Sequence, residues 1–192
     1  MADEREGSKA GRGLSAEFME ELLDAGSAMN MLLDRVRRDS SLSLEIRDGY
    51  FNVYYRGGSL AKVIRKQASH YSVEFNPKYF AGQPAPVSLV KSIASPQDAR
   101  AWLGTVPHLK DAMDLWFGAH SKDEREYQQL VVRDNNLRHA GTATDYFICD
   151  IEYSRPSMRF DLVAVHWPST GPDRKRKQKR GLAVIELKVL DG

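Results

Sequence analysis

Two apolar segments near the C-terminus, residues 159–165 and 181–188, most constrain what this chain can fold into. They read Arg-Phe-Asp-Leu-Val-Ala-Val and Gly-Leu-Ala-Val-Ile-Glu-Leu-Lys. β-Branched and other apolar residues run almost unbroken through both segments, which predicts two buried β-strands. The first segment nevertheless contains Asp161, and the second contains Glu186 and Lys188. Such residues are rarely buried unless they pair or bind a metal, so these strands predict a functional site.

The spacing of the three charged residues indicates which chemistry that site supports. Glu186 and Lys188 are two positions apart, so they project from the same face of one strand. If Asp161 on a neighbouring strand faces the same way, two carboxylates and an ammonium group converge. Two carboxylates can retain a divalent cation, which activates water and neutralises charge on a phosphate. The pattern therefore predicts a metal-dependent hydrolytic site, with a structural ion-pair set as the alternative.

The first half of the chain predicts a helix followed by an antiparallel β-meander. Residues 15–38 have helical apolar spacing, with Ser15 as the N-cap and Gly26 marking a bend. Residues 42–80 alternate as four short strands, joined by turns at Asp48-Gly49 and Gly57-Gly58. A loop is expected at residues 82–86.

The second half predicts helices and then three strands. Ser95-Pro96 is typical of a helix start, and this short helix is expected to end at 102–104. A longer helix is expected from 107 or 109 towards 136, with a break near Gly118. The strands are expected at 146–153, 160–167 and 182–190, with a tight turn at 154–157.

The helix–strand–strand–strand order, with the charged residues in the last two strands, resembles the PD-(D/E)xK nuclease superfamily. The match covers roughly residues 107–190, and Phe160 replaces the leading proline of the motif. The resemblance implies that Asp161, Glu186 and the backbone carbonyl of Leu187 hold Mg²⁺ (or Mn²⁺). It also implies that Lys188 positions the attacking water. The upstream helix normally adds a carboxylate, for which Glu126 is the first choice and Asp123 and Glu124 remain open.

The resemblance also sets the expected fold, which belongs to the α/β (α+β) class. We expect a restriction-endonuclease-like core at residues 95–192, built on a central mixed β-sheet flanked by helices. Residues 14–94 form the N-terminal helix and antiparallel β-meander that precede this core, and residues 1–13 form a disordered tail. Asp150 and Glu152 are either solvent-facing residues of their strand or additional metal ligands.

A basic loop between the two motif strands, at residues 168–181, predicts contact with a polyanion. Residues 173–180 carry a net charge of +5, so the rest of the chain is at −3. Lysine and arginine clusters of this kind make salt-sensitive, sequence-independent phosphate contacts. We expect the loop to leave the sheet close to the metal site. The cations concerned are Arg174, Lys175, Arg176, Lys177, Lys179 and Arg180.

Composition is consistent with a soluble cytoplasmic protein. The single cysteine, Cys149, cannot form an intramolecular disulfide and is expected to be a buried thiol. The chain has no run of 18 apolar residues and no signal peptide, so no membrane partner is expected. The expected function is a Mg²⁺-dependent nuclease acting on DNA, with RNA left open, and double-strand cutting favours a homodimer. The alternative is a catalytically inactive nuclease-like fold that binds nucleic acid or protein.

Overall fold

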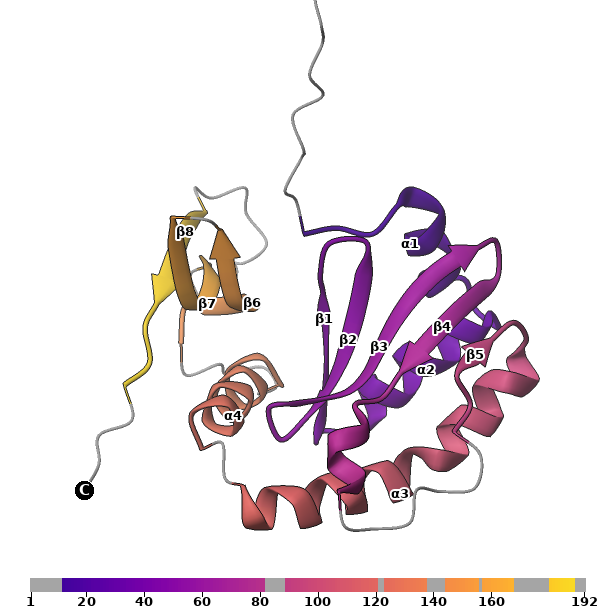
Figure 1. The fold of residues 1–192 in the computed structure, drawn as a ribbon. Helices are drawn as coiled ribbons and strands as arrows, with labels where there is room; N and C mark the ends of the chain where they lie inside the picture. The colour runs from indigo at the N-terminus through magenta and orange to yellow at the C-terminus, as the bar shows by residue number, and fades with distance from the viewer. Residues whose placement is uncertain are drawn as a thin grey trace, which may run out of the picture.

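The computed structural model describes residues 12–81, 89–120, 123–137, 144–155, 157–167 and 180–188 (Figure 1). These residues form four α-helices and two antiparallel sheets, of five and three strands. The expected α+β class is confirmed. The sheet of the C-terminal part, however, has three antiparallel strands, where the sequence predicted a central mixed sheet. The loop expected at 82–86 and residues 1–11 of the expected tail lie outside the described residues.

The first expected helix is divided into two, α1 (Ala16–Leu23) and α2 (Ala28–Arg38). Gly26 has φ +96°, a left-handed backbone conformation that cannot continue a helix. Each helix begins with its own serine cap: Ser15 Oγ accepts from the Phe18 N–H at 3.2 Å, and Ser27 Oγ accepts from the Asn30 N–H at 2.9 Å. The bend predicted at Gly26 is therefore a full break.

The predicted meander is confirmed, and one short strand extends it. The sheet contains β1 (Leu42–Ile46), β2 (Tyr50–Tyr55), β3 (Gly58–Gln67), β4 (His70–Glu74) and β5 (Ser92–Ile93), in that spatial order. A single 3₁₀ turn, η1 (Pro77–Phe80), follows β4. Phe51, Val63 and Ile93 are fully buried with residues of α1, α2 and the third helix, which cover the same face of the sheet. This is the larger core of the molecule.

The third helix, α3 (Pro96–Ala119), is one continuous helix where the sequence predicted two. It runs through Pro107 because Trp102, Val106, Leu109 and Met113 form one buried stripe at helical spacing. Packing of that stripe in the larger core outweighs the cost of an internal proline. The predicted break near Gly118 is confirmed, and α4 (Asp123–Leu137) follows it.

The last three strands form the smaller sheet, in the order β6 (Tyr146–Arg155), β7 (Met158–His166) and β8 (Gly181–Ile185). Its inner face contributes Ile148, Leu162 and Ala164 to a second core, which Val132 of α4 completes. Figure 1 shows this sheet and α4 beside the β1–β2 side of the larger sheet. The two sequence segments that predict the functional site are thus neighbours in one small sheet.

Candidate metal centre

The pairing of β7 with β8 brings the two segments that carry Asp161 and Glu186 side by side. The antiparallel register runs from His166↔Gly181 to Leu162↔Ile185. Continued by one residue past the end of β8, this register would set Asp161 opposite Glu186, on the same face and with Cβ atoms about 4.5–5.5 Å apart. Since Leu162 and Ile185 face the second core, Asp161 and Glu186 face away from it.

A hydrogen bond fixes this arrangement just beyond the last strand pair. The Leu187 N–H donates to Asp161 Oδ2 at 2.9 Å. The Leu187 side chain packs against the second core, which holds the segment after β8 in place. The bond occupies Oδ2 of Asp161, so Oδ1 can still serve as a metal ligand. Asp161 and the Leu187 backbone are therefore held together by a local contact, and Glu186 is the residue next to Leu187.

The three charged residues are not used as a structural ion-pair set. Asp161 is half-buried, while Glu186 and Lys188 are exposed. Within the described ranges none of the three forms a salt bridge, and the one contact there among these residues and Leu187 is the hydrogen bond to Asp161. The charges of Glu186 and Lys188 are thus accessible to a ligand.

The second motif strand is shorter and more exposed than the sequence predicted. It ends at Ile185, so Glu186 and Lys188 follow the strand and do not lie within it. Leu182 is 77% exposed and Val184 is 50% exposed, whereas buried side chains were expected. The physical reason is that α4 covers one face of the smaller sheet, so alternate residues of β8 lie at the surface.

Glu126, the first choice for the helix carboxylate, is engaged elsewhere. Its two oxygens accept from Arg56 Nε at 2.9 Å and Nη2 at 3.2 Å, and Arg56 also donates to Asp114 at 2.8 Å. Hydrogen bonds to these two carboxylates, first to Glu126, keep the pKa of Arg56 above its usual value. Glu126 therefore joins α4 to the β2–β3 turn. Glu124 is exposed, and the side chain of Asp123 lies outside the described residues.

The basic loop leaves the sheet at the end opposite to the candidate site, contrary to expectation. Its root is the His166–Gly181 pair, five residue pairs from Asp161 and Glu186. At about 3.4 Å per residue this is roughly 17 Å. Arg180, at the root, stacks over the Trp167 ring with 4.6 Å to the ring centroid. The remaining cations, Arg174, Lys175, Arg176, Lys177 and Lys179, lie outside the described residues.

Asp150 and Glu152 are both engaged in ion pairs with arginines. A β-bulge between Ile148 and Asp150 shifts the register of β6. Asp150 Oδ1 accepts hydrogen bonds from Arg12 and from Arg47, the latter at 3.0 Å. Burial raises the pKa of the Asp150 carboxyl, although both arginines oppose the rise. Glu152, whose φ is +53°, forms ion pairs through Oε1 with Arg125 at 3.1 Å and Arg159 at 3.4 Å.

Cys149, which the sequence predicted to be buried, is exposed. Its Sγ donates to the Val163 carbonyl at 3.3 Å, across the strand pair. Strict alternation would have placed Cys149 with Phe147 on a buried face. Instead Ile148 and Ile151 are buried, three positions apart, because the bulge inserts one residue between them.

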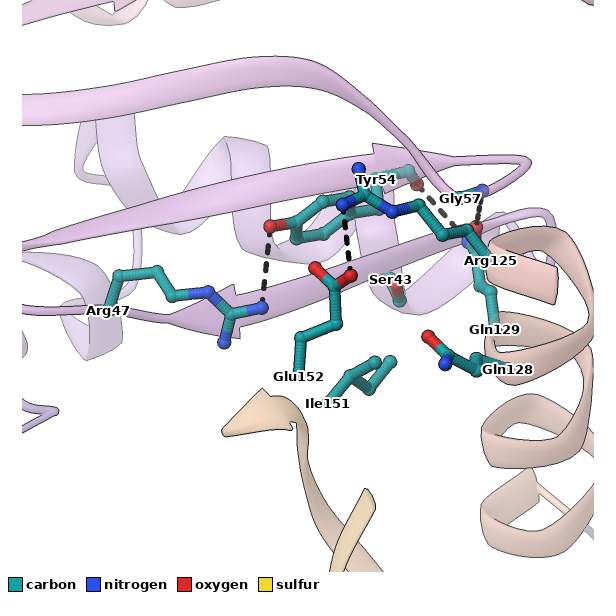
Figure 2. Close-up of a pocket in the computed structure, with 9 residues that line it drawn as sticks. All are labelled: Ser43, Arg47, Tyr54, Gly57, Arg125, Gln128, Gln129, Ile151 and Glu152. Atoms are coloured by element: carbon teal, nitrogen blue, oxygen red, sulfur yellow. Dashed lines mark hydrogen bonds and ion pairs between the residues drawn. The ribbon is translucent and has the colours of Figure 1, made fainter. Parts of the chain in front are cut away.

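Figure 2 shows a polar junction between the two sheets and α4 that the sequence did not reveal. Arg47 Nη2 donates to the Tyr54 hydroxyl at 3.3 Å, and Gln129 Nε2 donates to the Tyr54 carbonyl at 3.3 Å. Gln129 Oε1 accepts from the Gly57 N–H at 2.6 Å. The residues enclose a cavity of about 20 Å³, which has room for a single water molecule. The cavity is too small for a substrate, and neither Asp161 nor Glu186 lines it.

A buried carboxyl lies beside this junction. Glu45 is 9% exposed, and its Oε2 lies 3.9 Å from Nη1 of Arg47. Burial raises the pKa of Glu45 to about 7, and the charge of Arg47 opposes the rise. The alternation of residues in β1 places Glu45 on one face of the larger sheet, and Asp150 lies on that side. This alternation was visible in the sequence. Sequence alone did not show that a second sheet covers that face.

The described residues contain no larger metal-binding cluster than the candidate site. Across the described ranges, no group of three or more histidine, cysteine, aspartate and glutamate side chains is placed to hold a metal ion. None of the described helices is both long and apolar enough to cross a lipid bilayer. No protein-family model, curated protein or solved structure matches this chain.

Proposed function

We propose that this chain is a Mg²⁺-dependent nuclease that hydrolyses phosphodiester bonds of DNA. The observations that support the proposal are the register of β7 and β8, which leads to Asp161 and Glu186 at one end of the pair, and the hydrogen bond from the Leu187 N–H to Asp161. Two carboxylates on one face, free of ion pairs within the described residues, are suited to hold a cation.

The donor set fits Mg²⁺ better than it fits a metal held by protein ligands alone. Mg²⁺ commonly binds through one or two carboxylates, keeps several waters and also contacts substrate phosphates. Asp161, Glu186 and the carbonyl of Leu187 would supply oxygen ligands of this kind. This set needs no third acidic side chain. Mn²⁺ accepts similar oxygen ligands.

Each residue of the site has a distinct role in the proposed reaction. A bound divalent cation lowers the pKa of water and neutralises charge on the phosphoryl oxygens. Asp161 and Glu186 retain it. The Lys188 ammonium, exposed two residues after Glu186, donates hydrogen bonds that orient the attacking water. Glu126 is paired with Arg56, so we assign it to positioning α4.

The basic loop supports DNA as the substrate. Its cations would neutralise backbone phosphates without reading sequence. At the loop root, Trp167 holds the guanidinium of Arg180 by a cation–π contact. Cleavage of matched DNA and RNA strands by the same preparation would distinguish the two substrates.

Calorimetric titration with Mg²⁺ and a plasmid-nicking assay test the proposal together. Asp161→Asn keeps an oxygen that accepts from the Leu187 N–H but removes the charge, so it should fold normally, bind Mg²⁺ at least tenfold more weakly and lose nicking. Glu186→Ala should also lose nicking. Asp34→Asn, an equal change of charge on the exposed surface of α2, should behave as the wild type. If Asp161→Asn binds Mg²⁺ and nicks DNA as the wild type does, the site assignment is wrong.

The second candidate is a catalytically inactive nuclease-like fold that binds nucleic acid. The lack of a three-residue metal cluster in the described parts of the chain favours it. It predicts DNA binding that weakens with salt and does not respond to Mg²⁺ or to chelator. Nicking that depends on Mg²⁺ would eliminate this candidate.

A further inference from the structure

The two edges of the smaller sheet are protected very differently. At the β6 edge, Asn136 bonds both backbone groups of Ile148, donating from Nδ2 at 2.7 Å and accepting at Oδ1 at 3.1 Å. Arg12 donates to the carbonyls of Ile151 and Glu152 on the same strand. At the other edge, β8 pairs with β7 alone in the described part of the chain. Its outer backbone groups therefore have no strand partner there.

The exposed edge of β8 also lacks the features that normally prevent association. Its sequence, Gly-Leu-Ala-Val-Ile, contains no charge and no proline. Leu182 and Val184 project from its outer face and are 77% and 50% exposed. The apolar surface continues inward across the sheet, because Val165 and then Phe147 stand in the same cross-strand row as Leu182. An uncharged, apolar edge of this kind is suited to pair with another strand.

We propose that β8 pairs antiparallel with β8 of a second copy of this chain, about a two-fold axis at Ala183. The numbers of two opposed residues in such a pair add to a constant, which here is twice 183. Ala183 therefore stands opposite the partner's Ala183. Leu182 then stands opposite the partner's Val184, and Gly181 stands opposite the partner's Ile185. The two most exposed apolar side chains of the strand thus cover each other.

The ends of the pair supply charge complementarity that selects this register. One residue beyond each strand end, Arg180 stands opposite the partner's Glu186, and both are exposed. Moving the axis to Val184 would place Leu182 opposite the partner's Glu186. Moving it to Leu182 would place Val184 opposite the partner's Arg180. Only the axis at Ala183 matches apolar with apolar and cation with anion.

The same register brings a cation of one copy to the candidate metal centre of the other. Within one chain, Arg180 is six residues from Glu186, roughly 20 Å along the strand. Across the pair, Arg180 and the partner's Glu186 have Cβ atoms about 5 Å apart. Each site would therefore receive Arg180 from the partner copy. This last step rests on the proposed nuclease function, whereas the strand pairing does not.

Sedimentation velocity tests the pairing without reference to activity. The wild type should sediment as a dimer in a concentration-dependent equilibrium, and Val184→Lys should be monomeric at the same concentrations. Leu115→Lys is the matched control, because Leu115 is a 62% exposed leucine on α3, remote from β8. A wild type that stays monomeric at the highest soluble concentration, or a Val184→Lys variant that remains dimeric, would overturn the proposal.

Disulfide trapping tests the register. In a Cys149→Ser background, Ala183→Cys should cross-link two copies on mild oxidation, since directly opposed Cα atoms lie within disulfide range. Gly181→Cys is the control, because its Cβ fits with 3.6 Å to His166 Cβ but the two copies of residue 181 would be roughly 14 Å apart. Cross-linking of Gly181→Cys with none of Ala183→Cys would refute the axis.

Mixing two variants tests the contribution of Arg180 to the partner's site. Arg180→Ala and Glu186→Ala should each lower nicking, and their mixture should recover activity, because the mixed dimer contains one site with both residues. No recovery in a mixture shown to contain mixed dimers would refute the shared site. Wild type that dimerises but never nicks DNA would refute the nuclease function and leave the strand pairing intact.

Discussion

Replacing Gly57 with alanine tests how closely α4 packs against the larger sheet. Gly57 lies in the β2–β3 turn with φ +70°, next to Arg56 with φ +48°, which is the positive-φ geometry of a two-residue hairpin turn. A Cβ added at Gly57 would lie 2.6 Å from the backbone carbon of Arg125 and 2.8 Å from its oxygen. Both atoms belong to the main chain of α4, so the helix itself would have to move.

The expected cost has two parts. A left-handed backbone conformation costs a residue with a Cβ about 1–2 kcal/mol. Forcing an atom into a packed contact costs about 1–3 kcal/mol more. The displacement of α4 would also weaken the bond from the Gly57 N–H to Gln129 Oε1. We therefore expect Gly57→Ala to lower the free energy of unfolding by about 2–5 kcal/mol.

Gly49→Ala is a control for the backbone part alone. Gly49 has φ +74°, and nothing lies within 4 Å of its added Cβ, so this variant should lose about 1–2 kcal/mol. Urea unfolding followed by circular dichroism would give both values, and the difference measures the contact with α4. Equal destabilisation by the two substitutions would show that α4 does not pack against this turn.

Three further predictions concern the contacts between the two sheets. Because the pKa of Glu45 is raised from 4.5 to about 7, the folded state retains a proton that the unfolded state releases, so its stability should fall as pH rises from 4.5 to 7. Glu45→Gln should flatten that part of the stability–pH curve, by at most about 3 kcal/mol; an unchanged curve would contradict the raised pKa. Arg12→Ala removes a charged donor from Asp150 and should lower the free energy of unfolding by about 1–3 kcal/mol in thermal or urea unfolding. A loss below about 0.5 kcal/mol would show that the Arg12 side chain is not bound to Asp150. Glu126→Gln weakens the ion pair with Arg56 and should lower the free energy of unfolding by about 1 kcal/mol. It should not change the Mg²⁺ affinity measured by calorimetry, and a tenfold loss of that affinity would show that Glu126 is a metal ligand.

The elements that could be predicted from sequence are those with strong local signals. The meander was recognisable because Asp48-Gly49 and Gly57-Gly58 mark turns between alternating segments, and the helix start at Ser95-Pro96 was recognisable from its cap. The continuity of α3 through Pro107 was not, because it depends on a buried stripe that only tertiary packing defines.

The candidate site could be predicted only in part, for a similar reason. Asp161 and Glu186 stood out as charges within apolar segments, and the β7–β8 register ends one residue short of each of them. The pairing of Glu126 with Arg56 joins residues 70 positions apart, which no periodicity reveals. The exposure of β8 and the position of the basic loop both follow from register and from which sheet face α4 covers. The sequence of residues 168–185 alone shows neither the exposure of β8 nor the position of the loop.

The contact of Arg12 with Asp150 has a consequence for the order in which this chain assembles. The two residues are 138 positions apart. The N-terminal arm, which is the segment that carries Arg12, therefore leaves the ribosome long before β6 has been synthesised. Closing so long a loop is entropically costly until other contacts have shortened it. The arm should therefore attach last, after both hydrophobic clusters have formed.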